Sequence, residues 1–375
     1  MTLAMTVMVR DEADVIEAMI EHHLRQGVDV LIVTDNGSTD GTTEILESFA
    51  ADGRIQLSHE PTHDKRQGQA VTAMARRAAA EFGADWVINA DADEFWVPVD
   101  RSTTLAEVFS AMPSAIRSFT VPVIDMIGAP AEDGSGFDRL VYRDSRPVEM
   151  LNAVGLLAHS THDSAHVGDP DVTVSQGNHY VSIASAGSPP EGLGVEVLHL
   201  PWRSWRQYER KVRNAGLAYE RSGLTPSPNH HGMRDYRRLQ DGVLLSFYVA
   251  RHPSADELEQ GIADGWYTED RVLAEAGLPA TADSPIDATI EPIARATGAA
   301  LGRADAREAL LRREGEAAEA ARAAAEAAAE DLRRQLDSER GRAGDLAVQL
   351  AATRHRKVVR AADWASEKAR RVTRR

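Results

Sequence analysis

The sequence predicts an α/β fold, with a mainly parallel sheet flanked by helices and a long C-terminal helix. Three observations predict it. Short apolar runs alternate with segments of helical spacing over roughly the first 97 residues. Polar clusters directly follow several of these runs, as at the strand ends of a parallel sheet. Residues 303–350 are dominated by Ala, Glu and Arg and contain no aromatic side chain. We therefore expect a globular domain over 1–275, a linker over 276–302 and a helical tail over 303–375.

The first strand is expected over residues 4–9, AMTVMV, a short apolar run. Residues 11–25 then place apolar side chains at helical spacing, and Gly27 stands where a glycine commonly ends a helix. The run 28–33, VDVLIV, is rich in β-branched residues and predicts the second strand. The two strands and the helix between them form one β-α-β unit.

The same alternation continues to residue 88. A polar turn over 35–41 leads into a helix over 42–49, and a third strand is expected over 54–58. An Ala-rich helix over 67–82 precedes the fourth strand, 86–88. Short loops between such elements favour a parallel sheet covered by helices.

Polar residues at 10–12, 35–40 and 91–94 each follow a predicted strand. Ligands of open α/β sheets bind outside the carboxyl ends of the strands. We therefore expect the three clusters to converge on one edge of the sheet and to form a binding site there.

The rest of the first 300 residues is less regular. Strands and loops are expected between 115 and 200, and helices over 202–221 and 233–251. A stretch rich in Pro, Thr, Ala and Asp, about 276–292, has the composition of a linker.

Leucine and alanine side chains fall on a heptad seam in the C-terminal tail. Its members are Leu332, Leu336, Ala343, Leu346 and Leu350. Glu339 interrupts the seam, so the pattern predicts a long helix with weak coiled-coil potential. Homo-oligomerisation through this helix is a hypothesis.

Composition and charge narrow the function. The 375 residues include no cysteine, which excludes disulfides and thiolate chemistry, and 43% are apolar. The net charge is −16, but residues 354–375 hold nine Lys or Arg against two acidic residues, so the remainder carries −23. An acidic body argues against nucleic-acid binding.

Neither a signal-peptide core nor an apolar run near the ~20 residues of a membrane span occurs in the sequence. A cytoplasmic protein is expected. In the basic tail, Trp364 lies among Lys and Arg, as in helices that bind a membrane surface. Peripheral contact with the inner face of the membrane is one hypothesis, and a solvated helix end is the alternative.

The strongest motif is the segment NADADEFW, which contains Asp91 and Asp93 and follows the fourth strand. Two carboxylates at i and i+2 in a turn can approach one cation, and hard oxygen ligands suit Mg²⁺ or Mn²⁺. Such an ion neutralises a diphosphate leaving group. The alternative is a surface acidic turn.

The turn DNGSTDG begins at Asp35, where the second strand ends. Its glycines permit tight turns, and its Ser, Thr and Asp residues can cap the next helix. Asp35 is a candidate acceptor for a nucleobase or ribose, and a capped turn without a ligand is the alternative.

These segments resemble the family 2 glycosyltransferases, which have a GT-A type, Rossmann-like fold. The resemblance is carried by VMVRDEADVIEAMIEHHLRQGVDVLIVTDNGSTDGT and WVINADADEFW, and more weakly by HLPWRSW. It implies a catalytic domain that uses a nucleotide-sugar donor and inverts the anomeric carbon. It assigns Asp35 to the nucleotide, Asp91 and Asp93 to metal and diphosphate, and Arg10 and Glu12 to the nucleotide pocket. The chain departs from the family pattern at Asn36, where the commoner residue is Asp.

Three further groups are candidates around the donor. His199 ends an apolar run, and the resemblance makes it the third metal ligand; a structural histidine is the alternative. A basic face, formed by Arg203, Arg206, Arg210 and Arg213 beside Lys211, could hold diphosphate oxygens, with Arg203 and Lys211 as the main candidates. A solvated helix face that pairs with the acidic body is the alternative. Lys65 and Gln67, before the Ala-rich helix, are candidates for the nucleotide.

A direct displacement also needs a base near the acceptor hydroxyl. Asp163 and His179 are the candidates, in a region rich in histidine. The same region could instead form a second metal site, although its spacing fits no standard motif.

The sequence thus predicts transfer from a nucleotide sugar, expected to be a UDP-sugar, to a glycan or lipid-linked acceptor with Mn²⁺ or Mg²⁺. One alternative is a nucleotidyltransferase, which would normally carry a Gly-rich loop after the first strand, where VMVRDEAD has no glycine. The other is a non-catalytic adaptor that acts through the C-terminal helix.

Overall fold

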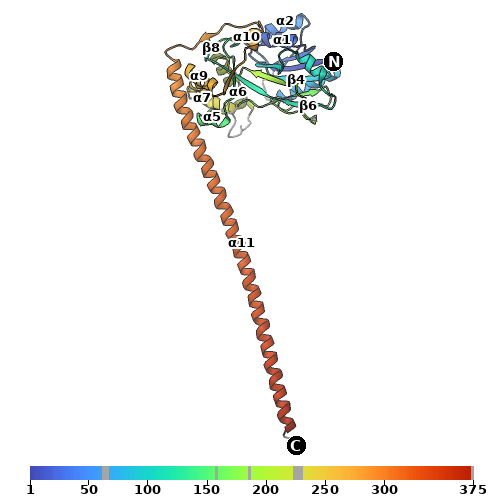
Figure 1. The fold of residues 1–375 in the computed structure, drawn as a ribbon, viewed down its shortest axis with the longest axis vertical. Helices are drawn as coiled ribbons and strands as arrows, with labels where there is room; N and C mark the ends of the chain where they lie inside the picture. Colours follow the sequence, from blue (N-terminus) through green and yellow to red (C-terminus); the bar gives the residue numbers. More distant parts are fainter. Residues whose placement is uncertain (61–66, 157–158, 185–186, 223–230, 373–375) are drawn as a thin grey trace. The chain divides into compact units, whose positions relative to one another are not determined.

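The structure is a computed structural model of the chain, and it describes residues 1–60, 67–156, 159–184, 187–222 and 231–372 (Figure 1). By its internal contacts the chain divides into two units, Met1–Ala306 and Arg307–Arg375. The first unit contains all of the predicted site residues.

The strands of the first unit are β1 (Leu3–Val9), β2 (Val30–Asp35), β3 (Gln56–His59), β4 (Trp86–Ala90), β5 (Glu94–Pro98), β6 (Ser118–Val121), β7 (Val123–Ile127), β8 (Ala131–Asp133), β9 (Tyr142–Asp144), β10 (Asp163–Val167), β11 (Val195–His199), β12 (Tyr267–Glu269) and β13 (Ser284–Pro285). The helices are α1 (Ile16–Arg25), α2 (Thr42–Ala51), α3 (Gln67–Phe82), α4 (Leu105–Ala111), α5 (Val148–Ala153), α6 (Trp205–Ser222), α7 (His231–Gln240), α8 (Leu244–Arg251), α9 (Ala255–Ala263), α10 (Val272–Glu275) and α11 (Glu291–Val372).

The main sheet has the strand order β3-β2-β1-β4-β10-β6, and β3, β2, β1 and β4 run parallel. Alternate side chains of β1 enter different cores. Leu3 and Met5 pack with α1, α2 and α4, whereas Ala4 packs with α3. Helices therefore cover both faces of the sheet, as predicted for an α/β fold.

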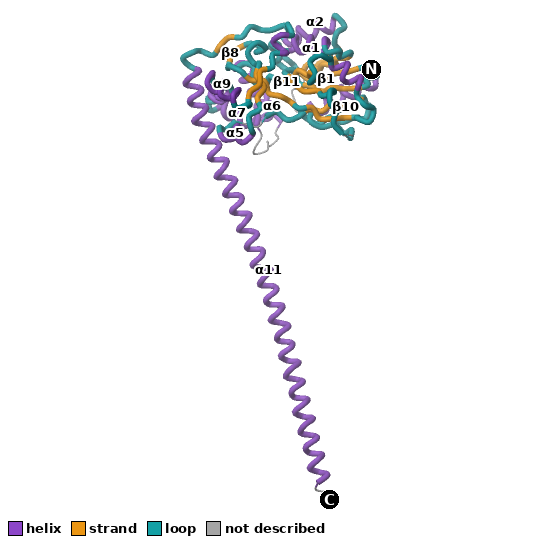
Figure 2. The backbone as a smooth tube through the Cα atoms, in the orientation of Figure 1, coloured by secondary structure: helices purple, strands orange, loops and turns teal. Residues whose placement is uncertain are grey.

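A second sheet, with the order β12-β9-β7-β11-β5, begins directly beyond the acidic turn, because β5 starts at Glu94. Figure 2 shows the strands of both sheets within the same unit. In this sheet β11 pairs antiparallel with β5 and parallel with β7. The turn between β4 and β5 therefore lies where the two sheets meet.

The predicted strand and helix alternation is confirmed over the first 90 residues. The first helix begins at Ile16 rather than at residue 11, because Asp11 adopts a left-handed backbone with φ 56°. The helix expected over 233–251 is broken into α7 and α8 around Gly242, where φ is 72°. Both breaks are local backbone features that hydrophobic spacing does not report.

The long C-terminal helix is confirmed: α11 has 82 residues. Pairs of opposite charge one turn apart, such as Arg322 with Glu326, support it. Near the start of α11, Ala294 is buried. A Cβ added at Gly298 would lie 2.0 Å from the Ser246 carbonyl oxygen, so the first turns of α11 pack closely on α8. The boundaries set at 275 and 302 remain predictions.

None of the helices in the described ranges combines the length and apolarity that crossing a lipid bilayer requires.

Candidate active site

The carboxyl ends of three parallel strands meet at one edge of the main sheet. Val9, the last residue of β1, is in register with Asp35, the last residue of β2. On the other side of β1, Val7 is in register with Ala90, which ends β4. Arg10 and Asp91, which follow these ends, are therefore brought to the same edge as Asp35.

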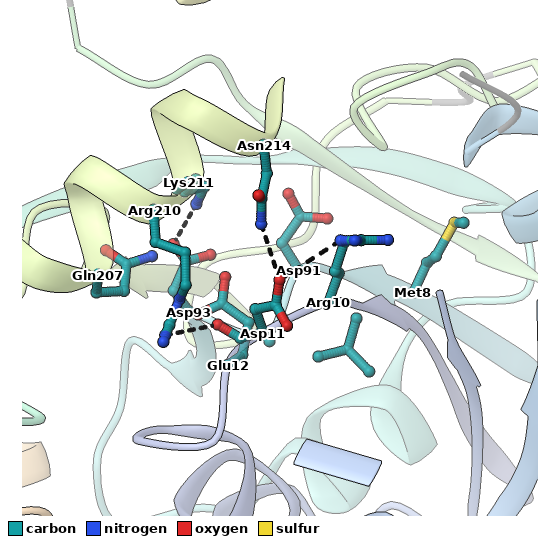
Figure 3. A pocket seen from close by; sticks show the side chains of 12 residues that line it. Met8, Arg10, Asp11, Glu12, Asp91, Asp93, Gln207, Arg210, Lys211 and Asn214 are labelled. Atoms are coloured by element: carbon teal, nitrogen blue, oxygen red, sulfur yellow. Dashed lines mark hydrogen bonds and ion pairs between the residues drawn. The ribbon is translucent and has the colours of Figure 1, made fainter. Parts of the chain in front are cut away.

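A cavity of about 180 Å³ opens at this edge, between the sheet and α6 (Figure 3). In Figure 3 the side chains of α6 point toward the acidic residues that follow β1 and β4. The lining residues are Met8, Val9, Arg10, Asp11, Glu12, Asp91, Ala92, Asp93, Gln207, Arg210, Lys211 and Asn214. The structure thus brings together six of the residues predicted from the sequence: Arg10, Glu12, Asp91, Asp93, Arg210 and Lys211.

Asp11 joins the loops around the cavity. Its Oδ1 accepts a hydrogen bond from the Thr39 backbone N–H at 2.7 Å, and its Oδ2 accepts one from Asn214 Nδ2 at 2.8 Å. Arg210 of α6 donates to the Asp11 carbonyl oxygen at 2.9 Å. These hydrogen bonds hold the first loop against both the second loop and α6.

Asp93 is surrounded by positive groups. Lys211 Nζ lies 2.6 Å from its Oδ2, Arg203 Nη1 lies 3.8 Å from the same oxygen, and His199 Nε2 lies 3.6 Å from its Oδ1. Burial by itself would raise the pKa of Asp93, but these charges hold it well below its ordinary value. Asp93 is therefore an ionised, buried carboxylate.

Asp91 differs from its neighbour in charge environment. Burial and the nearby charge of Asp93 raise the pKa of Asp91. Its Oδ1 lies 3.4 Å from Asn178 Nδ2, and its backbone N–H donates to Glu94 Oε2 at 2.8 Å. A cation placed near both carboxylates would lower the cost of ionising Asp91.

Arg203 lies beneath the cavity rather than in its wall. The side chain is completely buried, and it donates to Glu12 and, at 2.6 Å and 2.8 Å, to Asp14. Burial would lower the pKa of Arg203, but the two carboxylates raise it above its ordinary value. Its contacts are those of an internal ion-pair network.

The basic face predicted for the helix is divided in the structure. α6 begins at Trp205, after Arg203. Arg206 pairs with Glu132 at 3.3 Å, and Arg213 pairs with Glu209 at 2.5 Å, so neither lines the cavity. Arg210 and Lys211 are the basic residues of α6 that do.

Asp35 shapes the turn that follows β2. Its Oδ1 accepts hydrogen bonds from the Ser38 backbone N–H at 3.0 Å and from Ser38 Oγ at 2.6 Å, and its Oδ2 accepts one from Thr43 Oγ1 at 2.6 Å. It is buried and is not among the residues that line the cavity. The observed contacts are those of a capped turn, and its contact with a nucleobase remains a prediction.

The two candidate bases lie together. His179 Nδ1 is 3.6 Å from Asp163 Oδ1. Burial raises the pKa of Asp163 to about 7, and burial together with the charge of Asp163 raises the pKa of Glu94 well above its ordinary value. Asp163 and His179 thus form a polar pair beside Glu94, on the β10 side of the acidic turn.

Asp93 Oδ1 and His199 Nε2 are spaced as two ligand atoms of one divalent cation would be. Ligand atoms that each lie about 2.0–2.2 Å from one ion are separated by up to about 4 Å, and Asp93 Oδ1 and His199 Nε2 are 3.6 Å apart. Within the described ranges, no group of three or more His, Cys, Asp or Glu side chains is arranged to hold a metal. The residues therefore fit an ion that takes few protein ligands and completes its shell with water or phosphate.

The sequence of the first half of this unit matches a known family. Residues 6–144 match the model described as glycosyl transferase family 2. This part of the chain is therefore similar to the family 2 glycosyltransferases. The match includes the loops after β1, β2 and β4 and therefore most of the cavity wall.

Solved structures similar to the chain include three relevant ones. Glucosyl-3-phosphoglycerate synthase from Mycobacterium tuberculosis, in complex with Mn²⁺, UDP and glucosyl-3-phosphoglycerate, is 20% identical over 44% of this chain and 56% of that chain, with a TM-score of 0.25. A complex of the same enzyme with Mg²⁺ and UDP is 19% identical over the same shares, with a TM-score of 0.24. TarS 1-349 from S. aureus, in complex with UDP, is 12% identical over 68% of this chain and 81% of that chain, with a TM-score of 0.32.

The chain thus spans about half the length of the synthase that it matches. TM-scores this low do not establish a shared fold, so the fold assignment rests on the topology of the chain and on the family 2 match. No curated protein matches the chain.

Two of the predicted site residues within 6–144 lie wholly or partly outside the described part of the chain. Lys65 lies outside the described residues. Gln67 begins α3, but its side chain is likewise outside the described part.

The structure adds residues that the sequence did not single out. Asp14 pairs with Arg203, Asn214 binds Asp11, and Asn178 lies beside Asp91 with a positive φ of 62°. Asp125 lies in β7 against His199. Only Asp125 carried a signal in the sequence, because it is a lone charge in the apolar run VIDMI.

Proposed function

We propose that the chain transfers a sugar from a nucleotide-sugar donor, a UDP-sugar, to a hydroxyl group of a glycan or lipid-linked acceptor, with inversion at the anomeric carbon. One observation carries the proposal: Arg10, Glu12, Asp91, Asp93 and Lys211 line a single cavity at the carboxyl edge of a parallel sheet. The family 2 match supports the reaction class.

The cavity accounts for the charged part of the donor. Its volume of about 180 Å³ is smaller than the ~300–1,000 Å³ usual for ligand sites, so it suits a diphosphate better than a whole nucleotide sugar. Arg10, Arg210 and Lys211 place positive charge around it. The Lys211 side chain is 43% exposed, so its ammonium can contact phosphate oxygens.

Asp93 and His199 would contact Mn²⁺ or Mg²⁺ directly, and Asp91 would act through a water of the ion's shell. Such an ion, when bound, neutralises the diphosphate as it leaves. Arg203, which is buried beneath Asp93, would keep that carboxylate ionised and in place. We assign Arg203 this internal role rather than direct contact with the donor.

Asp163 is the proposed general base for the acceptor hydroxyl, and His179 is its proposed partner. The acceptor oxygen would form a bond to the anomeric carbon as the bond from that carbon to the diphosphate oxygen breaks. The hydroxyl proton would pass to the Asp163 carboxylate. His179, whose Nδ1 lies 3.6 Å from Asp163 Oδ1, would stabilise that carboxyl group.

Calorimetry with the full chain tests the proposal. UDP-, GDP- and dTDP-sugars are titrated with and without Mn²⁺. We expect a UDP-sugar to bind and Mn²⁺ to strengthen its binding. Absence of binding by every nucleotide sugar, with Mn²⁺ present and the protein folded, would contradict the proposal.

A further inference from the structure

Three adjacent strands of the second sheet place ionisable side chains in one row. His199 of β11 is in register with Glu94 of β5 on one side and with Asp125 of β7 on the other. The imidazole therefore lies between strands that each present a carboxylate, while its Nε2 faces Asp93 Oδ1 at 3.6 Å.

Asp125 is held firmly in this row. It is 1% exposed, and its Oδ1 accepts a hydrogen bond from Ser160 Oγ at 2.6 Å while its Oδ2 accepts one from the Ser160 backbone N–H at 3.1 Å. His159 Nδ1 lies 3.5 Å from the same Oδ2. Asp125 Oδ1 is also 3.2 Å from His199 Nδ1, and Ser160 Oγ lies 3.0 Å from the same nitrogen. The reaction proposed above gives Asp125 no role.

We propose that Asp125 is a positioning residue for His199, and that Ser160 supports it. A carboxylate that accepts the Nδ1–H of His199 fixes the ring and leaves Nε2 as the ligand atom, directed toward Asp93. The inference rests on the proposed function, because it assigns His199 and Asp93 to a divalent cation.

The hydrogen bonds around Asp125 explain how its carboxylate can be buried within a strand. Burying an ionised carboxylate costs free energy unless several hydrogen-bond donors surround it. Around Asp125 the donors come from Ser160, His159 and His199. An Asn at position 125 would keep the size of the side chain but can donate to Nδ1. That would favour the tautomer that carries its proton on Nε2, and a protonated Nε2 cannot be a metal ligand.

The test measures Mn²⁺ binding to the full chain without nucleotide, by electron paramagnetic resonance titration. The variants are His199→Ala, Asp125→Asn and Ser160→Ala. The matched control is Asp144→Asn, because Asp144 is also buried in this sheet, where it pairs with Arg146 at 2.7 Å. Thermal unfolding is recorded for each variant.

We expect Asp125→Asn to weaken Mn²⁺ binding by about 10- to 100-fold, the range usual for loss of an outer-shell partner, and Ser160→Ala to weaken it less. Asp144→Asn should bind Mn²⁺ as the wild type does.

If His199→Ala loses Mn²⁺ binding but Asp125→Asn does not, the positioning role of Asp125 is wrong and the metal site stands. If Asp125→Asn and Asp144→Asn lose affinity equally, in step with their unfolding temperatures, Asp125 is merely structural. If the wild type binds no Mn²⁺, the metal part of the proposed function falls, and this inference falls with it.

Discussion

Arg203 is the residue on which the internal charge network of the site depends. Its guanidinium is completely buried between Glu12 and Asp14 and lies 3.8 Å from Asp93. Replacing it by Met would leave buried carboxylates without their partner. We expect Arg203→Met to lower the free energy of unfolding by about 3–5 kcal/mol in chemical denaturation.

Arg206→Met is the matched control, because Arg206 follows shortly after Arg203 in the sequence and is 65% exposed. Its loss should cost no more than about 1 kcal/mol. Equal effects of the two substitutions would show that the buried network does not stabilise the domain.

Much of the site, but not its chemistry in detail, is predictable at this scale. Arg10 and Asp91 could be placed from sequence because each directly follows a strand, Asp93 lies in the same turn as Asp91, and parallel strands end together. Arg203 was expected in contact with phosphate because its sequence neighbours are basic. Its burial depends on Glu12 and Asp14, which lie 191 and 189 residues earlier in the chain, and no local sequence pattern indicates that pairing.

At the scale of elements, two neutral histidines of α1 form hydrogen bonds with the backbone of β5. His22 Nε2 donates to the Trp96 carbonyl oxygen at 2.9 Å, and His23 Nε2 accepts from the Trp96 backbone N–H at 3.1 Å. Burial lowers the pKa of His22 to about 4 and lowers that of His23 well below its ordinary value. This attachment therefore requires uncharged imidazoles.

Part of the pH dependence of the protein's stability follows from His22. Between its unfolded pKa of about 6.5 and its folded pKa of about 4, the unfolded chain binds a proton that the folded chain does not, so stability falls as the pH falls. His22 should make the protein about 2 kcal/mol less stable at pH 5 than at pH 7. The difference between wild type and His22→Gln isolates this contribution from that of the carboxylates. An identical pH dependence in the two proteins would contradict the assignment.

Gly27, after α1, is required for two reasons. Its φ is 85°, and an added Cβ would lie 2.5 Å from Ala106 Cβ at the start of α4. Gly53 has a similar φ of 70° but no atom of the described residues within 4 Å of the added Cβ. We expect Gly27→Ala to cost about 1–3 kcal/mol more than Gly53→Ala in denaturant unfolding. Equal costs would mean that α4 does not pack against this turn.

Elements with local signals were predictable, and those that depend on distant pairing were not. The helix expected over 67–82 coincides with α3, because its alanines give high helix propensity. β10 has the sequence DSAHV, and its polar residues gave no strand signal. It forms a strand because β4 and β6 pair with it on either side, which sequence patterning does not show.

At the scale of the whole molecule, the first unit contains the complete candidate site. Donor binding should therefore persist, with its dissociation constant changed by no more than about twofold, when the chain is truncated after Ala306. Calorimetry on the truncated and full chains checks this expectation. Loss of donor binding by a folded truncated chain would show that the C-terminal unit takes part in the site. An adaptor, by contrast, would lose its function with α11.

The central claim is that Asp91 and Asp93 hold a divalent cation at a donor diphosphate. The most direct measurement is Mn²⁺-stimulated hydrolysis of a UDP-sugar by the Asp91→Ala, Asp93→Ala double variant, with Asp264→Ala, at an exposed turn, as control. Circular dichroism verifies folding, and Asp93→Asn serves as the milder second variant. We expect stimulation to fall at least about 100-fold in the double variant and to be unchanged in the control. Full Mn²⁺-stimulated hydrolysis by the folded double variant would contradict the account.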